Sequence, residues 1–481
     1  MNKNLKKTKI IATLGPATSS KETMIQMIQA GVDVFRINFS HADYELVKRN
    51  VDIIREINKE YGYSVSILGD LQGPKLRVGV VKEGSFLNPG DVLTFTNEKM
   101  EGDSTKVYMT YEKFPQDVKV GERILIDDGK LVLEVIETNE VDTVRAKTIQ
   151  GGPLSSKKGV NLPNTNVSLP ALTEKDIEDA NFMLDNEFDW IALSFVRHAQ
   201  DIIDLKDLMA KHPTNKTKTP IIAKIEKPEG VKNIDQILME CDCLMVARGD
   251  LGVEVPMEQV PVIQKNLVNK ARLYAKPVII ATQMMETMIT SLTPTRAEVN
   301  DVANSVLDGA DAVMLSGETS VGKYPVDVVR NMAKIVKNIE RTALYSKLNH
   351  VIEEKINCVD ERFITDKICR SAVDIAKSTG AEAIVTLTAS GYTAFQISAH
   401  RPSSHIIVFS SNKRVITMLN LLWGVRAFYY DMQKSTDETV IQVNMLTHNY
   451  GFVEQGDFVV NLNAMPVHNG GKTNTLRLST I

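Results

Sequence analysis

Ile221-Ile222-Ala223-Lys224-Ile225-Glu226 is the part of the chain whose composition says most about the fold. Its apolar residues follow one another almost without a break, instead of alternating with polar ones. Such a run is typical of a parallel β-strand that is buried on both faces, because helices then cover both sides of the sheet. The same kind of run recurs on either side of it.

Seven more runs rich in Val, Ile and Leu surround this stretch, and helical segments separate them. They cover residues 9–14, 34–40, 65–70, 190–195, 244–248, 278–282 and 312–316. Eight strand–helix units predict an α/β fold in which the strands close into a TIM (β/α)8 barrel. An open doubly wound sheet, built from the same units, is the alternative.

Start and stop signals support the helical segments. Ser19 with Glu22 and Thr295 with Glu298 each fit a capping box, in which two side chains three residues apart bind the free N–H groups of a helix start. Gly31 fits a helix end, because glycine tolerates the left-handed conformation that often closes a helix.

The spacing of the strands predicts an inserted domain. The gap between residues 65–70 and 190–195 is much longer than any other gap between the runs. It contains alternating stretches such as 132–137, and turn signals at 88–91 and 151–153. A small β domain is therefore expected after the third strand.

A further α/β unit is expected after the barrel, with helices near 366–378 and 393–400 and strands at 383–387 and 406–409. The chain then divides into a barrel domain interrupted once, an insertion and a C-terminal domain. The predicted ranges are 1–72 for the first part of the barrel, 73–169 for the inserted β domain, 170–345 for the second part of the barrel and 346–481 for the C-terminal α/β domain.

The composition excludes several classes of protein. Of the 481 residues, 43% are hydrophobic and 24% charged, which excludes wholesale disorder. A formal net charge of −4 does not suit a nucleic-acid surface, so no nucleic-acid partner is expected. No apolar run approaches the ~18 residues that span a membrane, and the lysine-rich start runs into an apolar stretch too short for a signal peptide. We expect a cytoplasmic protein without membrane contact.

The four cysteines, Cys241, Cys243, Cys358 and Cys369, are too few for a disulfide framework. Cys241 and Cys243 could form half of a metal site, but no second pair and no nearby His completes it. Buried reduced thiols are the preferred interpretation, because free cysteine is among the most buried residue types.

Polar residues at the ends of these strands indicate where chemistry takes place. Arg36, Asn38 and Ser40 alternate with apolar residues, so they are expected on one face of the second strand. An exposed edge strand is the alternative, but a closed barrel has no edge. The third strand ends at Asp70, the seventh at Thr282 and the eighth at Ser316.

The fifth and sixth strands carry the strongest signal. Lys224 and Glu226 share one face of a hydrophobic strand, where charges are costly unless they are paired or bind a metal. The sixth strand leads into a glycine-bearing loop with Asp250, whose N–H groups can hold an anion. Two carboxylates facing a cavity suit Mg²⁺. A structural Lys224–Glu226 ion pair is the alternative.

Together with Arg36 and Arg77, these groups predict a cationic pocket for a small molecule that carries a phosphate and a carboxylate. The chain contains no P-loop and no nucleophile elbow, which excludes the two corresponding enzyme classes. The residues themselves therefore indicate a Mg²⁺-dependent barrel enzyme that acts on a phosphate or an enolate.

At these positions the sequence resembles the pyruvate kinase family, from about residue 8 to residue 478. The blocks that carry the resemblance are residues 36–41, 222–230, 245–252, 281–284, 294–298, 314–319 and 473–477. The resemblance implies a TIM barrel with a small β-barrel lid inserted and a C-terminal α/β effector domain. It also implies transfer of a phosphoryl group from phosphoenolpyruvate to ADP, giving pyruvate and ATP as the last step of glycolysis.

The resemblance also assigns residues to substrate and metal. Glu226 and Asp250 would ligate Mg²⁺, or Mn²⁺ in its place, and the backbone at Ala247, Gly249 and Asp250 would bind the carboxylate of phosphoenolpyruvate. Lys224 and Arg36 would contact the phosphoryl group. Thr282 would lie near the carbon that gains a proton, in a relay with Ser316 whose final donor stays open.

A K⁺ site is implied for many family members, and here Asn38, Ser40, Asp70 and the Leu71 carbonyl match its ligands. Lys75 stands where those members have Glu. Its ammonium could replace the K⁺ charge, as in the bacterial branch called type II, so little or no K⁺ is expected to be needed. A Lys75 side chain that merely points into solvent is the alternative.

The resemblance further implies a nucleotide site and an effector site. His41 and Arg77 would lie near the phosphates of ADP. Residues Thr388, Ser390, Gly391 and Thr393 would bind a sugar phosphate or a nucleotide, although an ordinary capped loop would show the same residues. A homotetramer is implied as well.

Two rival functions use the same residues. A barrel carbon–carbon lyase that handles pyruvate enolate would also need the metal carboxylates, but neither the lid nor the effector domain. A metabolite-sensing binding protein should have lost Lys224, Glu226, Asp250 or Thr282, and all four are present.

Overall fold

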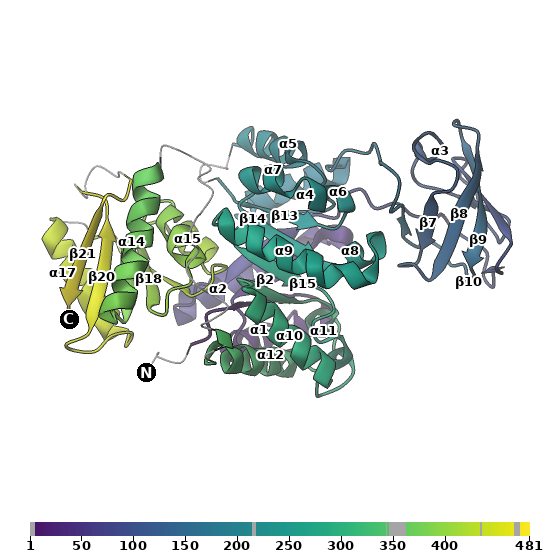
Figure 1. The fold of residues 1–481 in the computed structure, drawn as a ribbon. Helices are drawn as coiled ribbons and strands as arrows, with labels where there is room; N and C mark the ends of the chain where they lie inside the picture. The colour runs from purple at the N-terminus through teal and green to yellow at the C-terminus, as the bar shows by residue number, and fades with distance from the viewer. Residues whose placement is uncertain (1–4, 214–217, 343, 346–361, 433–434, 466–471) are drawn as a thin grey trace.

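The computed structural model describes residues 5–481 apart from 214–217, 343, 346–361, 433–434 and 466–471. A central barrel lies between two smaller domains, a largely β domain at one end and an α/β domain at the other (Figure 1). The expected boundary after residue 345 falls next to residues 346–361, outside the described part of the chain.

The centre of the molecule is a closed barrel of parallel strands. They are β1 (Lys9–Thr13), β2 (Val34–Asn38), β3 (Ser66–Asp70), β12 (Trp190–Leu193), β13 (Ile221–Ile225), β14 (Cys243–Ala247), β15 (Val278–Ala281) and β16 (Ala312–Leu315). Their order around the barrel is β1-β16-β15-β14-β13-β12-β3-β2. All eight predicted runs are therefore barrel strands, the TIM barrel is confirmed, and the open sheet is excluded.

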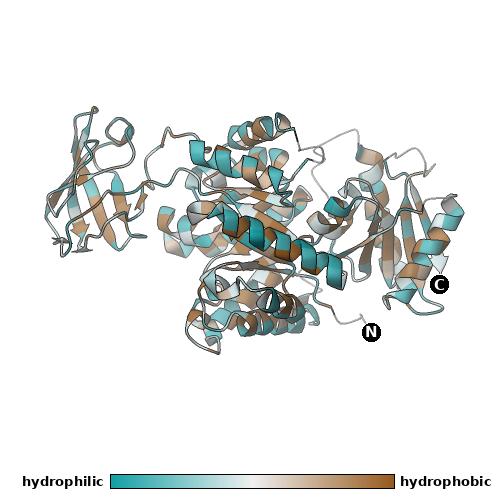
Figure 2. Ribbon diagram, turned by 180° about the vertical axis from the view of Figure 1, so that it is seen from behind, coloured by the Kyte–Doolittle hydropathy of each residue, from teal (hydrophilic) through white to brown (hydrophobic). Residues whose placement is uncertain are grey.

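Helices surround the barrel and turn their polar faces outward (Figure 2). They are α1 (Lys21–Ala30), α2 (Tyr44–Tyr61), α4 (Glu174–Asp185), α5 (Ala199–Ala210), α6 (Pro228–Lys232), α7 (Ile234–Glu240), α8 (Arg248–Glu254), α9 (Val260–Leu273), α10 (Arg296–Asp308), α11 (Gly317–Ser320) and α12 (Pro325–Glu340). Short 3-10 turns are η1 (Pro16–Thr18), η2 (Phe39–His41), η3 (Met257–Gln259) and η4 (Glu286–Ile289). The strands inside are mostly apolar and mostly buried, as the sequence predicted.

Two of the three predicted helix signals are confirmed. Thr295 and Glu298 form both halves of the capping box of α10, and Gly31 ends α1 with a φ of 131°. The box predicted for Ser19 is wrong, because Ser19 closes η1 and Ser20 caps α1 by accepting from the Thr23 N–H.

The second strand is shorter than predicted. β2 ends at Asn38, whose side-chain oxygen accepts the Ser40 N–H at 3.1 Å and thereby opens η2. Asn side chains often compete in this way for the backbone. Ser40 therefore lies outside the strand, and the prediction that it shares a strand face with Arg36 was wrong.

The domain between β3 and β12 has its own sheet and its own core. Its elements are β4 (Phe86–Leu87), β5 (Val92–Thr96), β6 (Lys106–Tyr108), α3 (Phe114–Asp117), β7 (Arg123–Ile126), β8 (Leu131–Thr138), β9 (Thr143–Gln150), β10 (Gly152–Pro153) and β11 (Val160–Asn161). Six strands form a sheet of order β11-β7-β8-β9-β5-β6, and β10 pairs with β4. The alternating side chains of these strands bury a core that extends from Leu76 to Leu162.

The C-terminal domain is a five-stranded sheet of order β19-β18-β17-β20-β21 with helices on it. Its elements are α14 (Phe363–Thr379), β17 (Ala383–Leu387), α15 (Tyr392–Ala399), β18 (His405–Ser410), α16 (Lys413–Leu419), β19 (Val425–Tyr429), α17 (Thr436–Asn449), β20 (Phe458–Asn463) and β21 (Thr475–Thr480). β21 is an antiparallel edge strand, and the others are parallel.

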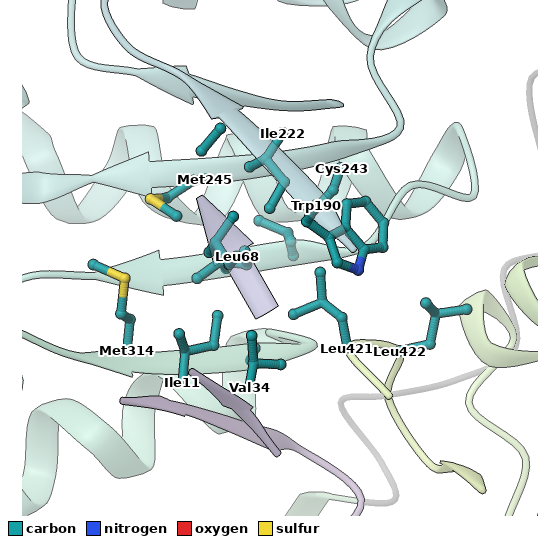
Figure 3. Packing of buried hydrophobic residues seen from close by; sticks show 14 of the residues in the cluster. Ile11, Val34, Leu68, Trp190, Ile222, Cys243, Met245, Met314, Leu421 and Leu422 are labelled. Carbon is teal, nitrogen blue, oxygen red and sulfur yellow. The ribbon is translucent and has the colours of Figure 1, made fainter. Parts of the chain in front are cut away.

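The barrel and one face of this C-terminal sheet share a single hydrophobic core. Leu421 and Leu422 come from the C-terminal domain and approach Trp190 at the amino-terminal end of the barrel (Figure 3). Cys241 and Cys243 are buried free thiols, as is Cys369, while Cys358 lies outside the described residues. Within the described chain, no helix is long and apolar enough to cross a membrane.

Candidate active site

Polar side chains gather at the carboxyl ends of neighbouring barrel strands. Thr13 ends β1, Asp70 ends β3, and Ser194 directly follows β12. Arg36 and Lys224 lie within the last three residues of β2 and β13. Since these five strands are consecutive around the barrel, the fold brings residues from distant parts of the chain to one edge.

Asp70 is the centre of this group. Its carboxylate is 1% exposed, accepts a hydrogen bond from Arg36 Nε at 2.7 Å, and lies 3.1 Å from Lys224 Nζ. Burial alone would raise the pKa of Asp70, but the two cations outweigh burial and hold the pKa below its usual value. Asp70 is therefore charged at neutral pH and orients both cations.

Two hydroxyl groups that the sequence did not single out complete the network. Thr13 Oγ1 accepts a hydrogen bond from Arg36 Nη1 at 3.0 Å. Ser194 Oγ accepts from Lys224 Nζ at 2.6 Å and donates to the Leu71 carbonyl at 2.7 Å. Each is a polar residue at the end of an apolar run. Because barrel enzymes carry their functional residues at the carboxyl ends of the strands, that position could have identified both residues from the sequence.

Lys224 is held between two carboxylates. Its Nζ lies 3.0 Å from Glu226 Oε1 and 3.1 Å from Asp70 Oδ1. Burial would lower the pKa of Lys224, yet Asp70 and Glu226 raise it above its ordinary value. The Lys224–Glu226 ion pair, which was the alternative interpretation of this strand, is present as part of a larger charged network, in which the ammonium stays protonated.

Glu226 and Asp250 are the two predicted metal ligands, at the ends of the neighbouring strands β13 and β14. Glu226 is 1% exposed, and its second oxygen accepts the Phe195 N–H at 2.7 Å. Burial raises the pKa of Glu226 in spite of Lys224, and the charge of Asp250 adds to the rise. Asp250, in the first turn of α8, has no side-chain hydrogen bond or ion pair among the described residues.

These two carboxylates fit a hard divalent cation. Such an ion would reduce the repulsion between them, and it would give the Asp250 carboxylate a partner that the described residues do not supply. No group of three or more His, Cys, Asp or Glu that could hold a metal occurs in the part of the chain that the structure describes. A Mg²⁺ ion here would therefore take its other ligands from substrate oxygens and water, as Mg²⁺ commonly does.

The start of α8 is tied to the next strand through Thr282. Ala247 is the residue before the helix, and the Gly249 N–H donates to Thr282 Oγ1 at 2.7 Å. Thr282 Oγ1 donates in turn to the Ala281 carbonyl at 2.6 Å. Thr282 has a φ of +69°, a conformation that is unfavourable for a β-branched residue and that recurs at functional sites.

Arg248, the first residue of α8, stabilises the backbone at Thr282. The sequence analysis did not assign it a role. Its guanidinium forms two hydrogen bonds of 2.7 Å to the Asp301 carboxylate and one of 2.7 Å to the Thr282 carbonyl. The bidentate pair fixes the loop between β15 and η4 against α10. Its signal in the sequence was an arginine next to the predicted anion loop.

Ser316 follows β16, next to β1 in the barrel. Its N–H donates to Glu318 Oε2 at 2.7 Å, and Glu318 is buried. The structure records no hydrogen bond between the hydroxyls of Ser316 and Thr282, so the two predicted members of the proton relay lie at the same end of the barrel without direct contact.

A cleft separates this edge of the barrel from the inserted domain. Its lining includes Asp250, Arg197 and Lys227 from the barrel side, and Lys75 and Asn161 from the other side. A buried carboxylate, Glu254, joins the two sides: it pairs with Lys227 and accepts from Asn161 Nδ2 at 2.8 Å.

The predicted K⁺ ligands are engaged by protein groups. Asn38 Oδ1 accepts from Ser40, Asp70 is paired with two cations, and the Leu71 carbonyl accepts from Ser194. Lys75 is exposed, and within the described residues its ammonium makes no ion pair with any of them.

The predicted nucleotide and effector residues lie apart from this network. Arg77 belongs to the inserted domain, where it donates to the Lys157 carbonyl at 3.1 Å, and the His41 side chain lies outside the described part. In the C-terminal domain, Thr388 Oγ1 accepts the Gly391 N–H at 2.8 Å. Thr393 is buried and hydrogen-bonded to Thr473, while Ser390 is exposed.

Comparisons with known proteins agree with one another. A family model described as pyruvate kinase, barrel domain, matches residues 5–329, and one described as pyruvate kinase, alpha/beta domain, matches residues 366–479. A pyruvate kinase of Mycobacterium intracellulare is 42% identical over 475 residues, which are 98% of each chain. Pyruvate kinase 2 of Synechocystis sp. is 45% identical over 463 residues, covering 95% of this chain and 76% of the relative. The crystal structure of a pyruvate kinase from Cryptosporidium parvum matches with a TM-score of 0.91 at 34% identity, covering 99% of this chain and 96% of the other.

Proposed function

The chain belongs to the pyruvate kinase family, and we propose from this premise which of its residues carry the reaction. It is a phosphotransferase of glycolysis that converts phosphoenolpyruvate and ADP into pyruvate and ATP. One observation carries the assignment: the Lys224 ammonium lies 3.0 Å from Glu226 and 3.1 Å from Asp70 at the open end of the barrel.

Arg36 and Lys224 bind the phosphoryl group of phosphoenolpyruvate. Phosphoryl transfer depends mostly on positioning and on neutralising charge, which two fixed cations supply. Asp70 contacts both of them and prevents either from turning away. Thr13 and Ser194 support the same two side chains by hydrogen bonds, and act as positioning residues.

The substrate carboxylate binds at the start of α8, to the backbone around Ala247, Gly249 and Asp250. Free N–H groups at a helix start favour an anion. The Gly249 N–H is held by Thr282 Oγ1 at 2.7 Å. A carboxylate that takes this N–H releases the Thr282 hydroxyl to face the substrate.

Glu226 and Asp250 would hold the divalent metal, Mg²⁺ or Mn²⁺. When bound, the metal would supply positive charge next to the substrate. The buried position of Glu226 supports this role, because its charge otherwise faces Asp250 without full compensation. The Lys224 ammonium pairs with Glu226 Oε1 and so helps to fix the orientation of this carboxylate.

Departure of the phosphoryl group leaves the enolate of pyruvate, and Lys224 stabilises its negative charge. A proton must then reach the methylene carbon. Thr282 is the residue we place nearest to that carbon, and Ser316 belongs to the relay that resupplies the proton, which is consistent with their positions at the ends of neighbouring strands.

ADP enters the cleft between the barrel and the inserted domain. Residues 73–169 form the proposed lid over it, with Arg77 and His41 near the nucleotide phosphates. The contact of Asn161 with Glu254 at 2.8 Å supports a lid that meets the barrel at this cleft. The remaining proposed ranges are 1–72 and 170–345 for the barrel and 346–481 for a regulatory domain.

We further propose that the enzyme needs little or no K⁺. Lys75 carries a positive charge in the lining of the same cleft as Asp250. Turnover that is equal in K⁺ and in a K⁺-free buffer is the expected result for the natural chain. Lys75→Glu should create K⁺ activation, and strong K⁺ activation of the unaltered chain would show the proposal to be wrong.

Three properties are carried over from the family. The loop with Thr388, Ser390, Gly391 and Thr393 is the proposed effector site, for a sugar phosphate or a nucleotide. A homotetramer is proposed. The outer edge of β21 supports it, because no strand among the described residues pairs with that edge and such an edge favours association. A cytoplasmic location fits the metabolic step.

The function is tested by a steady-state assay with phosphoenolpyruvate, ADP and Mg²⁺, in which ATP and pyruvate are measured separately. Equal yields of both products are expected. Pyruvate without ATP would point to a phosphatase, and the absence of both products would point to the carbon–carbon lyase or to a binding protein.

A further inference from the structure

A small cavity lies where the end of α9 meets the C-terminal domain. The end of α9 is on the side of the barrel that faces this domain (Figure 1). The cavity has a volume of ≈ 10 Å³, which is room for about one water-sized group. No member of the network around Lys224 lines it, so it is separate from the candidate active site.

Three cationic side chains converge on this cavity. Arg272 comes from the last turn of α9, Lys276 from the turn before β15, and Arg401 from the segment after α15. Both guanidinium groups are buried, because Arg272 is 7% exposed and the Arg401 side chain 1%. Buried charges of one sign repel each other and lose their hydration, so such a group requires compensating anions.

Among the described residues, one acidic side chain lines the cavity, and it is already engaged. Asp311 accepts hydrogen bonds from Arg401 Nη1 at 3.0 Å and from Arg401 Nη2 at 2.8 Å. Its Oδ2 also accepts the Val278 N–H at 2.9 Å. Asp311 therefore balances the charge of Arg401. The further charges of Arg272 and Lys276 exceed what this carboxylate can neutralise.

The pKa of Arg272 reflects the excess of positive charge. Burial lowers this pKa, and the neighbouring Arg401 lowers it further, while Asp311 and Tyr345 act in the opposite direction. The result is a pKa of about 10, below the ordinary value of arginine. Arg272 is still charged at neutral pH, so two like charges lie close together beside the cavity.

Arg401 also has an unused hydrogen-bond donor. Its two Nη atoms donate to Asp311 and to the carbonyls of Ser398 and Gly309. No described residue accepts from its buried Nε. A buried donor without an acceptor is costly. Next to a cavity lined by cations, it indicates a ligand that accepts hydrogen bonds and carries a negative charge.

Apolar side chains form other walls of the cavity and limit the size of its occupant. They include Pro277, Phe395 and Leu422, and Leu422 is buried at the contact between the two domains (Figure 3). Apolar walls exclude water and so strengthen the attraction between an anion and the guanidinium groups. Phosphates, sugar phosphates and carboxylates are much larger than one water, so a monatomic anion is the class of ligand that fits.

We propose that this cavity binds a monatomic anion such as chloride, which bridges Arg272 at the end of α9 and Arg401 after α15. The bound ion joins the barrel to the C-terminal domain through its charge. Binding of the ion is independent of the proposed reaction and of any effector, because the residues that hold it belong to neither site.

Bromide can locate the site, because it replaces chloride and gives an anomalous signal. Crystals of the full-length protein soaked in sodium bromide should show an anomalous peak in the cavity, within hydrogen-bonding distance of Arg401 Nε and of the Arg272 guanidinium. A water molecule without anomalous signal at that position would overturn the proposal. This experiment uses the natural chain and needs no variant that has to fold.

A titration in solution tests whether chloride binds the folded protein. The thermal unfolding midpoint of the full-length chain is measured while sodium chloride replaces sodium gluconate at constant ionic strength. The gluconate anion is too large for the cavity. A ligand that binds only the folded state raises the midpoint as its concentration rises, so we expect a saturable increase. Equal midpoints in the two salts throughout the titration would overturn the proposal.

Arg272→Gln tests the role of the charge. The half-saturating chloride concentration should rise at least about tenfold, as expected when a hydrogen bond to a charged group is lost. Arg426→Gln is the matched control, because Arg426 pairs with Asp33 across the same domain contact, at 3.5 Å, but does not line the cavity. This control should keep the chloride dependence of the natural chain.

An unchanged half-saturating concentration in Arg272→Gln contradicts the proposed site, as does an equal loss in Arg426→Gln. If Arg272→Gln does not fold, Lys276→Gln repeats the comparison at the third cation, which is half-buried. A weaker chloride dependence is expected for that variant too, and an unchanged one counts against the site.

Discussion

Replacing Lys224 by methionine is the perturbation whose consequence follows most directly from the structure. Lys224 Nζ lies 3.0 Å from Glu226 and 3.1 Å from Asp70, and its side chain is 11% exposed. Methionine has a similar length and fits the apolar strand, so the barrel should fold. The variant then lacks one of the two cations that face the phosphoryl group and the enolate.

The expected loss in kcat is about 10³-fold. A charge at about 3 Å interacts with another by roughly 5 kcal/mol at an effective dielectric constant of about 20. About 4 kcal/mol of this acts on the transition state if Lys224 is preorganised, and each ~1.36 kcal/mol is a factor of ten in rate. The raised pKa of Lys224 keeps the natural side chain charged throughout the neutral range.

The assay is steady-state pyruvate formation at saturating phosphoenolpyruvate, ADP and Mg²⁺. Lys227→Met is the matched control, because Lys227 also lines the cleft and also pairs with a buried carboxylate, that of Glu254. Its kcat should stay within about tenfold of the natural enzyme, since surrounding ion pairs contribute little to the transition state. A folded Lys224→Met variant with kcat within tenfold of the natural value would refute the reasoning.

Three further predictions follow from the same structure. Glu226→Gln should raise the half-saturating Mg²⁺ concentration at least about tenfold, because one charged ligand is lost; Glu258→Gln, at an exposed position, should leave it unchanged. Burial raises the pKa of Cys241 to about 12, so at pH 8 its thiol should resist a disulfide reagent until denaturant is added, and reaction in the native state would contradict this. Arg401→Met leaves the buried Asp311 without its partner and should lower the unfolding free energy in urea by about 3 kcal/mol, whereas a loss below about 1 kcal/mol would not fit.

The barrel was predictable because its signal is local. Each strand, such as Ile221–Ile225, is a run of apolar residues, and burial on both faces requires such a run whatever lies around it. Signals that depend on one hydrogen bond were less secure. Ser20, and not Ser19, caps α1. The Asn38 side chain accepts the Ser40 N–H, and β2 ends before Ser40. Both differences arise because neighbouring polar groups compete for the same backbone N–H groups.

The site was predictable where a charge interrupts an apolar strand, as Lys224 does. It was not predictable where a single hydroxyl supports that charge, because Ser194 meets Lys224 only through the register of two strands. The contacts between the barrel and the C-terminal domain were the hardest to predict from the sequence. An aspartate before a strand, as in Asp311-Ala312, is visible in the sequence, but its pairing with Arg401 requires the folded arrangement of two domains.

The position of the divalent metal tests the central claim most directly. Crystals soaked with Mn²⁺ and phosphoenolpyruvate, measured for anomalous scattering, should show a peak about 2.1 Å from carboxylate oxygens of both Glu226 and Asp250. A peak bound by other carboxylates, such as that of Glu254, with none between Glu226 and Asp250, would contradict the account.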